Sequence, residues 1–392
     1  MKYNDYNGDK LSTGYGGKNR FTTSTVIDDA RTSAIAIIAS ILVLAILTGA
    51  VFVMFRDDFA FPTWEDVMSD LTATTTTTKP KPVVGDPSTS YPYATKTDKT
   101  QFVANEGGKG LGYLDLNSEY AILIRVDDMA TLGYKYADKK IYPASMTKVM
   151  TVITALDYIK DLDDIYIFNP EIVSSLVNGE SVADMKYIYD EYGINNYTVR
   201  DILYGISYRS GADAVLCLMD YLGFTMTEFV ELMNEKAISI GLTKTHFGGA
   251  IGMNDEENQT TCREMAAIMA YAMENEYARE FFSGQRYYFD LHDGFSYYNR
   301  TFQNTIIDSM KTTVGKLLGS NYNWIATKSG YDIIKKDGTG AGYCLVSYIE
   351  GKDGSSYVVV TAKAERYTDD TIYAPSANPV YDLAKIFNSL NP

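Results

Sequence analysis

The stretch YPASMTKVMTVITALDYI, residues 142–159, places a serine and a lysine three residues apart in an otherwise apolar segment. Apolar residues recur there at helical spacing, namely Met146, Val149, Met150, Ile153 and Leu156. This pattern predicts a buried helix that begins just after Pro143. Because residues i and i+3 share one face of a helix, Ser145 and Lys148 are expected to be neighbours.

A serine beside a buried lysine has a chemical meaning. Burial disfavours the ammonium form and lowers the pKa of a lysine, so Lys148 can serve as a base, and a base is what activates a serine hydroxyl. The free N–H groups and positive dipole at a helix start also suit an oxyanion. Ser145 begins the only Ser-x-x-Lys in the chain. The alternative is a surface pair that falls three residues apart by accident, and only other motifs can decide.

Composition narrows the class of protein. The 392 residues are 46% hydrophobic, enough for one large core or two smaller ones, and the net charge of −15 argues against nucleic-acid binding. Only His246 and His292 are histidines, which disfavours a Ser-His-Asp triad and a histidine-based zinc site. A serine enzyme with this composition is therefore expected to use a lysine base.

The three cysteines predict no disulfide framework. Cys217, Cys262 and Cys344 are odd in number and far apart. We expect buried free thiols.

An uncharged run of 24 residues from Thr32 to Phe55 is long enough to cross a bilayer. Five basic residues precede it, whereas Asp57 and Asp58 closely follow it, so the positive-inside rule places the N-terminus in the cytoplasm. We predict an uncleaved single-pass anchor in the cell membrane, with the bulk of the chain extracytoplasmic. A cleaved secretory signal is the alternative.

The rest of the chain divides by composition. We expect a short cytoplasmic tail over 1–31, the anchor over 32–55, a Thr/Pro-rich extracytoplasmic linker over 56–104 and a globular domain over 105–392. The domain is predicted to contain these elements: strands at Ala121–Val126 and Thr131–Tyr136, the Ser145 helix, a helical region over Thr198–Gly241 broken near Arg209–Gly211, a helix near Thr261, strands at 323–330, 343–349 and 356–364, and a closing helix over 378–390. Strands at both ends with helices between them favour one α+β domain whose first and last strands pair.

Two further motifs carry the same chemistry as Ser145. Ser210-Gly211-Ala212 breaks two helical segments and can present a hydroxyl from a tight turn, although it can also be a plain helix-to-helix turn. Lys328-Ser329-Gly330 ends a predicted edge strand, where a lysine and a hydroxyl can hold a carboxylate. Glycine there lets a substrate approach the backbone closely.

The order Ser-x-x-Lys, Ser-Gly-x, Lys-[Ser/Thr]-Gly resembles that of penicillin-binding proteins and serine β-lactamases. Over about residues 105–392 the chain looks like the D-alanyl-D-alanine carboxypeptidases, the low-molecular-mass penicillin-binding proteins. The stretches that carry the likeness include YPASMTKVMT, RDILYGISYRSGADAV and TKSGYDIIKKDGTGAGYCLVSYIE. The resemblance implies a β-lactamase/transpeptidase-like fold, an antiparallel sheet flanked by helices with a helical subdomain, here preceded by one transmembrane helix.

The resemblance also implies roles in catalysis. Ser145 would be the acylated nucleophile, Lys148 its activating base, and Ser210 a relay that passes a proton to the leaving D-alanine amine. The backbone N–H groups of Ser145 and Tyr331 would form the oxyanion hole.

Substrate binding is implied for the third motif, Lys328-Ser329-Gly330. Lys328 and Ser329 would hold the terminal carboxylate, with Gly330 and Tyr331 beside it. Two positions depart from the family pattern: Ala212 stands where an asparagine is usual, and Ser329 where a threonine is usual. Ala212 cannot supply the amide that contacts the substrate and the lysine.

The implied activity is removal of the terminal D-alanine from peptidoglycan stem peptides, and β-lactams would bind the same serine. The resemblance implies no metal and no cofactor. One alternative is a serine β-lactamase, for which Glu231 and Asn234 offer a superficial deacylation pair within a predicted helix. The other is a catalytically weak muropeptide-binding protein, which only Ala212 supports.

Overall fold

The computed structural model describes residues 91–176, 180–253, 256–292, 297–304, 306–307, 321–364 and 378–390. The predicted tail, the predicted anchor and most of the predicted linker lie outside these ranges. The chain separates into two units at Thr77/Thr78, and every described residue belongs to the second. Among the described residues there is no helix with the length and hydropathy needed to cross a bilayer.

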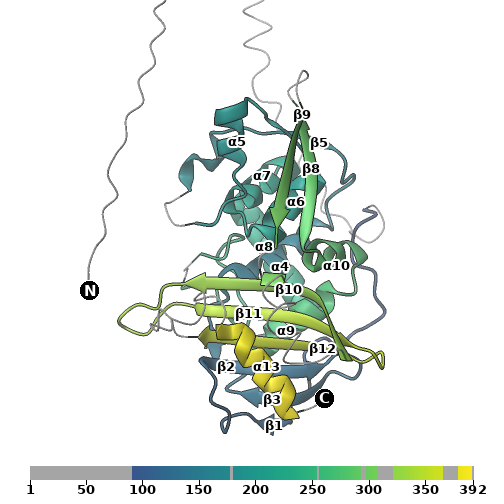
Figure 1. Ribbon diagram of the computed structural model, residues 1–392, viewed down its shortest axis with the longest axis vertical. Coiled ribbons are helices and arrows are strands. Elements are labelled where there is room, and N and C mark those ends of the chain that lie inside the picture. The colour runs from purple at the N-terminus through teal and green to yellow at the C-terminus, as the bar shows by residue number, and fades with distance from the viewer. Residues whose placement is uncertain are drawn as a thin grey trace, which may run out of the picture. The chain divides into compact units, whose positions relative to one another are not determined.

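A six-stranded sheet organises this second unit. Its strand order is β1-β3-β2-β12-β11-β10 (Figure 1). The strands are β1 (Lys109–Gly110), β2 (Ser118–Arg125), β3 (Ala130–Lys135), β10 (Tyr322–Asp332), β11 (Gly342–Gly351) and β12 (Ser356–Ala364). β12 pairs antiparallel with β2, with Val359 opposite Leu123, so the predicted pairing of the first and last strands is confirmed. The expectation of a wholly antiparallel sheet is wrong at one edge, because the two-residue β1 runs parallel to β3.

Helices cover both faces of the sheet because its central strands are apolar on both sides. α13 (Asn378–Leu390) lies across one face, where Leu383 and Phe387 pack with Leu123 (Figure 1). α9 (Cys262–Ala272) contacts β2, β11 and β12 and belongs to the other, larger core. The predicted helix near Thr261 and the predicted closing helix are both confirmed.

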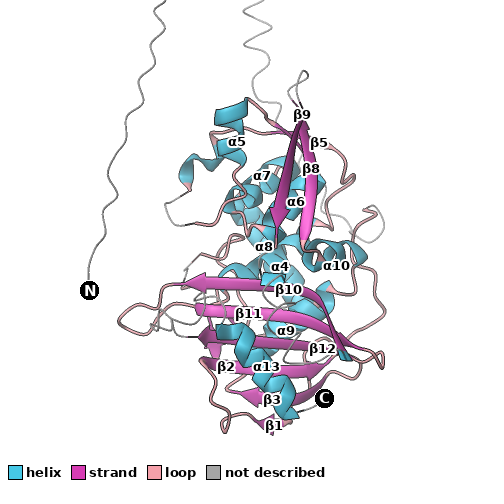
Figure 2. Cartoon of the chain, in the orientation of Figure 1, coloured by secondary structure: helices cyan, strands magenta, loops and turns pink. Residues whose placement is uncertain are grey.

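A mainly helical part includes the nucleophile turn and lies, in sequence, between β3 and β10 (Figure 2). Its helices and strands are η1 (Ala144–Thr147), α4 (Lys148–Ala155), η2 (Ile172–Ser175), α5 (Met185–Tyr192), α6 (Val199–Tyr208), α7 (Ala212–Leu222), α8 (Met226–Ser239), α10 (Glu276–Ser283) and the pairs β5 (Ile165–Ile167) with β6 (Asn196–Thr198), β4 (Lys140–Ile141) with β7 (Thr260–Thr261) and β8 (Arg286–His292) with β9 (Tyr297–Gln303). The region 198–241 breaks after Tyr208 as predicted. It breaks again at Gly223, whose φ of 76° ends α7, and Thr225 then caps α8. The β8–β9 hairpin was not predicted.

Residues 91–104 were assigned to the linker, but the structure packs part of this segment into the domain. Phe102 is 2% exposed and makes an edge contact with Tyr271, with 5.0 Å between ring centroids. The buried Arg263 guanidinium donates to the carbonyl oxygens of Ala104 and Asn105. The folded part therefore starts before the predicted boundary at residue 105, because these aromatic side chains bury apolar area.

Candidate active site

Ser145 does not lie in the α-helix that its sequence pattern predicted. It belongs to the 3₁₀ turn η1, and α4 begins at Lys148. In a 3₁₀ turn, residues three apart are eclipsed, so the two side chains still meet. Lys148 Nζ donates to Ser145 Oγ at 3.0 Å, which confirms that the two residues are neighbours.

The surroundings of Lys148 favour its neutral amine. The side chain is 1% exposed, and its Nζ also donates to the Ile251 carbonyl oxygen at 2.6 Å. Burial lowers the pKa of Lys148 to about 7, although the charges of Glu180 and Asp213 act in the opposite direction. A lysine with such a pKa can accept a proton from Ser145 near neutral pH.

Ser210 occupies the break between α6 and α7, where its φ of 56° turns the chain sharply. Lys328, on the edge strand β10, donates to Ser210 Oγ at 3.0 Å and to the Ser329 carbonyl oxygen at 2.8 Å. Burial, together with the charge of Lys148, holds the pKa of Lys328 well below its usual value of 10.5. The second and third motifs are thus joined by a direct hydrogen bond.

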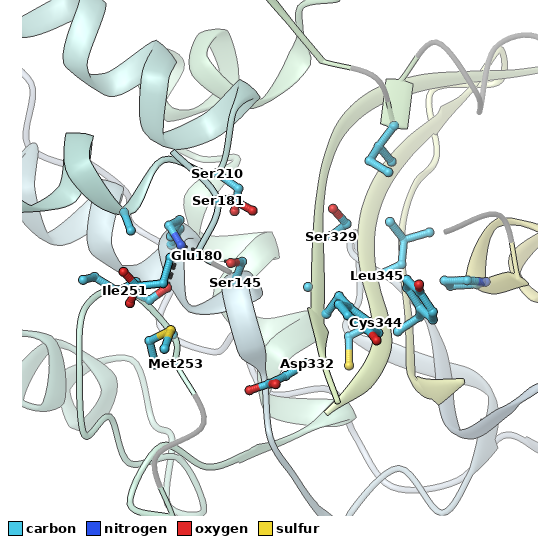
Figure 3. Close-up of a pocket in the computed structure, with 18 of the residues that line it drawn as sticks. Ser145, Glu180, Ser181, Ser210, Ile251, Met253, Ser329, Asp332, Cys344 and Leu345 are labelled. Atoms are coloured by element: carbon cyan, nitrogen blue, oxygen red, sulfur yellow. Dashed lines mark hydrogen bonds between the residues drawn. The ribbon is translucent and has the colours of Figure 1, made fainter. Parts of the chain in front are cut away.

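The predicted site residues line two cavities that share part of their walls. A cavity of about 380 Å³ has most of them in its walls: Ser145, Lys148, Ser210, Ser329, Gly330 and Tyr331. Lys328 lines an adjoining polar cavity of about 180 Å³ that shares Ser210 and Ser329. In Figure 3, Ser145 lies between a wall with Glu180, Ser210 and Ile251 and a wall with Ser329 and Cys344. Residues from three distant parts of the sequence therefore converge here.

Gly330 is where strand β10 meets the nucleophile turn. A Cβ atom at this position would lie 2.7 Å from the Pro143 carbonyl oxygen and 3.1 Å from the Ser145 backbone nitrogen. The absence of a side chain lets β10 approach the turn closely, and Ser145 and Tyr331 line the same cavity. Their proposed use as an oxyanion hole stays a prediction.

We expect Gly330→Ala to reduce acylation of Ser145 about tenfold or more while the fold is kept, because β10 must move away from the turn and misplace the substrate. The measurement is the rate of labelling by a fluorescent penicillin. Gly110→Ala is the matched control, because a Cβ atom there meets nothing within 4 Å. Unchanged labelling of Gly330→Ala would show that this close approach is unimportant.

Some residues of the cavity were not predicted. Glu180, Ser181, Ile251 and Met253 line it, and none belongs to a recognisable motif. Asp213, the residue after Ala212, was not predicted to have a role either. Its buried carboxylate accepts hydrogen bonds from the backbone N–H groups of Ala183 and Met185.

The two residues considered for a β-lactamase reaction lie outside this cavity. Glu231 and Asn234 belong to the continuous helix α8, as expected, and line a separate cavity with His246. The three cysteines are buried free thiols, as predicted. In the described ranges, no group of three or more His, Cys, Asp or Glu side chains is arranged to hold a metal ion.

Comparison with known proteins identifies a family. The family model for D-alanyl-D-alanine carboxypeptidases matches residues 108–364. The chain is 32% identical over 167 residues to the D-alanyl-D-alanine carboxypeptidase DacF of Bacillus subtilis, covering 43% of this chain and 41% of that protein. It is 30% identical over 208 residues to DacC of Escherichia coli, covering 50% of each. The matches thus span only about half the length of these relatives.

Solved structures support the fold. A crystal structure of a DD-transpeptidase from Streptomyces has a TM-score of 0.58 and 23% identity, covering 71% of this chain and 98% of that one. A D-alanyl-D-alanine carboxypeptidase from Mycobacterium tuberculosis has a TM-score of 0.56 and 21% identity, covering 72% and 95%. At these identities the likeness establishes the fold alone, an arrangement of sheet and helices that these two structures share with this chain.

Proposed function

Because this chain belongs to the D-alanyl-D-alanine carboxypeptidase family, we propose that it removes the terminal D-alanine from peptidoglycan stem peptides. The reaction runs through an ester on Ser145, and β-lactams acylate the same oxygen. The observation that carries this proposal is the 3.0 Å hydrogen bond between Lys148 Nζ and Ser145 Oγ, made by a lysine that is 1% exposed.

Acylation begins when the neutral Lys148 amine takes the Ser145 proton as Oγ attacks the carbonyl carbon between the two D-alanines. The oxygen of the tetrahedral intermediate is held by the N–H groups of Ser145 and Tyr331. The C–N bond then breaks, and the proton passes from Lys148 through Ser210 to the leaving amine. Water hydrolyses the ester, which yields the shortened peptide and restores the Ser145 hydroxyl.

The third motif positions the substrate. The Lys328 ammonium and the Ser329 hydroxyl bind the terminal carboxylate, and the missing side chain of Gly330 leaves room for the peptide along β10. Lys328 contacts Ser210 directly, so carboxylate binding and proton relay occur side by side.

The test is release of D-alanine from diacetyl-L-lysyl-D-alanyl-D-alanine by the full chain. We expect release that stops after incubation with benzylpenicillin. A β-lactamase would instead turn over a chromogenic cephalosporin efficiently. A muropeptide-binding protein without activity would release no D-alanine from any stem peptide.

The pH profile follows from the two lysines. D-alanine release is expected to rise with pH through about 7, because only the neutral Lys148 amine can accept the Ser145 proton. At higher pH, D-alanine release should decline, because Lys328 must stay charged to bind a carboxylate. Since the pKa of Lys328 is lowered, this decline should occur before the pH reaches 10.5. The measurement is kcat/KM between about pH 5 and 10. A profile that is flat on the acid side would contradict the role of Lys148.

We also propose that residues 32–55 anchor the protein in the cell membrane, with the domain extracytoplasmic. The support is the uncharged run and its flanking charges. Protease added to cells stripped of their wall is expected to digest the chain after Arg56 and to spare residues 1–31. A soluble mature protein that starts near residue 50 would indicate a cleaved signal instead.

A further inference from the structure

Lys148, the base of the proposed reaction, has fewer hydrogen-bond acceptors around its Nζ than an ammonium group can use. Lys148 Nζ carries up to three N–H groups, and within the described residues it donates to two acceptors, Ser145 Oγ and the Ile251 carbonyl oxygen. Ala212 lines the same cavity but offers only a methyl group. A proton that arrives on this buried nitrogen during acylation needs a negative charge nearby.

One chain segment brings such a charge to the cavity. The segment 180–185 crosses the start of α7, where the Ser181 carbonyl oxygen accepts a hydrogen bond from Ala212 N–H at 2.8 Å. The Asp213 carboxylate accepts from the N–H groups of Ala183 at 2.7 Å and Met185 at 3.0 Å. Asp213 is 2% exposed, so these hydrogen bonds fix the segment firmly to the helix.

The fixed segment places Glu180 in the cavity wall. Figure 3 shows Glu180 on the same side of the cavity as Ser210 and Ile251. The ionisable groups that act on Lys148 are Glu180 from this segment, Asp213 from α7 and, through mutual repulsion, Lys328 from β10. Of the two carboxylates, only Glu180 is among the residues that line the cavity itself, and Asp213 is occupied by backbone N–H groups.

We propose that Glu180 is a positioning residue for Lys148: its carboxylate stabilises the ammonium that forms when Lys148 takes the proton of Ser145. The inference rests on the proposed function, since it assigns the group that supports the base of that reaction. Nothing in the sequence motifs marks Glu180, which acts only because Asp213 holds its segment against α7.

The proposal has a distinctive kinetic consequence. Glu180 raises the pKa of Lys148 against the lowering caused by burial. Removing the charge leaves more free amine at low pH but makes that amine a weaker base. The pH profile of Glu180→Gln should therefore cross that of the parent, because the variant is faster below the crossing and slower above it. A residue that only supports the loop would slow the reaction at every pH.

The experiment follows acylation of the full chain by benzylpenicillin between about pH 5 and 9. For Glu180→Gln we expect an acid limb shifted to lower pH by about half a unit or more, with rates roughly two- to fivefold above the parent at the acid end and similarly below it at the alkaline end. Glu180→Asp keeps the charge and should retain most of the parent's acid limb. Glu171→Gln, an exposed carboxylate outside the cavity walls, should match the parent throughout.

The outcomes separate the two proposals. If the parent is never acylated, the proposed function itself fails and this inference falls with it. If the parent is acylated but Glu180→Gln shows an unshifted acid limb, whether at full or uniformly reduced rate, the role of Glu180 is wrong and the proposed function stands. Should Glu180→Gln not fold, Glu180→Ala takes its place as the variant without the charge: an acid limb shifted to lower pH relative to Glu171→Gln supports the proposal, and an unshifted acid limb overturns it.

Discussion

Ser145→Ala is expected to abolish covalent labelling by penicillin and to reduce release of D-alanine by a factor on the order of 10⁵ or more. The reason is that Ser145 Oγ is the atom that forms the ester, and the Lys148 amine beside it has no other hydroxyl at hydrogen-bond distance in the described residues. Ser145 is only partly buried, and loss of its hydroxyl leaves the packing of η1 intact.

The label is followed by gel fluorescence with a fluorescent penicillin, and the fold by circular dichroism. Ser175→Ala is the matched control, because Ser175 is exposed and lies outside the cavity. Persistent labelling of a folded Ser145→Ala variant would remove Ser145 from the mechanism.

Lys148→Met is expected to lower the rate of acylation by about 10³-fold or more while it raises the stability of the fold. Methionine fills the buried volume of the lysine stem but cannot accept a proton. The stability change follows from the lowered pKa: below pH 10.5 the unfolded chain binds a proton at this lysine, and the folded chain resists it until about pH 7. Lysine therefore destabilises the native state increasingly as the pH falls from 10.5 to about 7, and methionine removes this cost.

The change in stability of Lys148→Met is measured by thermal unfolding at pH 7 and at pH 10. The gain in Tm should be larger at pH 7. Lys139→Met is the control, because Lys139 is exposed. If Lys148→Met keeps the acylation rate of the parent, Lys148 is not the base. If Lys148→Met is less stable than the parent at both pH values, burial of Lys148 does not destabilise the native state.

The sequence predicted the parts of the site that depend on local patterns. The proximity of Ser145 and Lys148 and the strand that carries Lys328-Ser329-Gly330 follow from local helix and strand patterns, and both are found in the structure. The 3₁₀ geometry at Ser145 does not follow from periodicity, because the preceding Ala144 has a backbone conformation that no periodic pattern marks. The Ala144 carbonyl oxygen lies where a side chain of Gly252 would be, and Ala144 itself adopts a φ of 46°.

Residues that act through long-range backbone contacts could not be predicted. Asp213 bonds to Ala183 and Met185, about 30 positions away in sequence, and no repeat or motif marks such a pairing. Glu180 enters the cavity only as a consequence of that contact. The β8–β9 hairpin escaped prediction because its pattern of aromatic and polar residues lacks clear alternation.

The most direct test of the central claim is to capture the acyl-enzyme with a substrate peptide. The full chain is mixed with diacetyl-L-lysyl-D-alanyl-D-alanine and quenched in acid, and the adduct is located by mass spectrometry of proteolytic fragments while free D-alanine is counted. We predict a diacetyl-lysyl-D-alanyl ester on Ser145, with one D-alanine released for each ester formed in the first turnover. An adduct on another residue, or release of D-alanine without any ester on Ser145, would contradict the account.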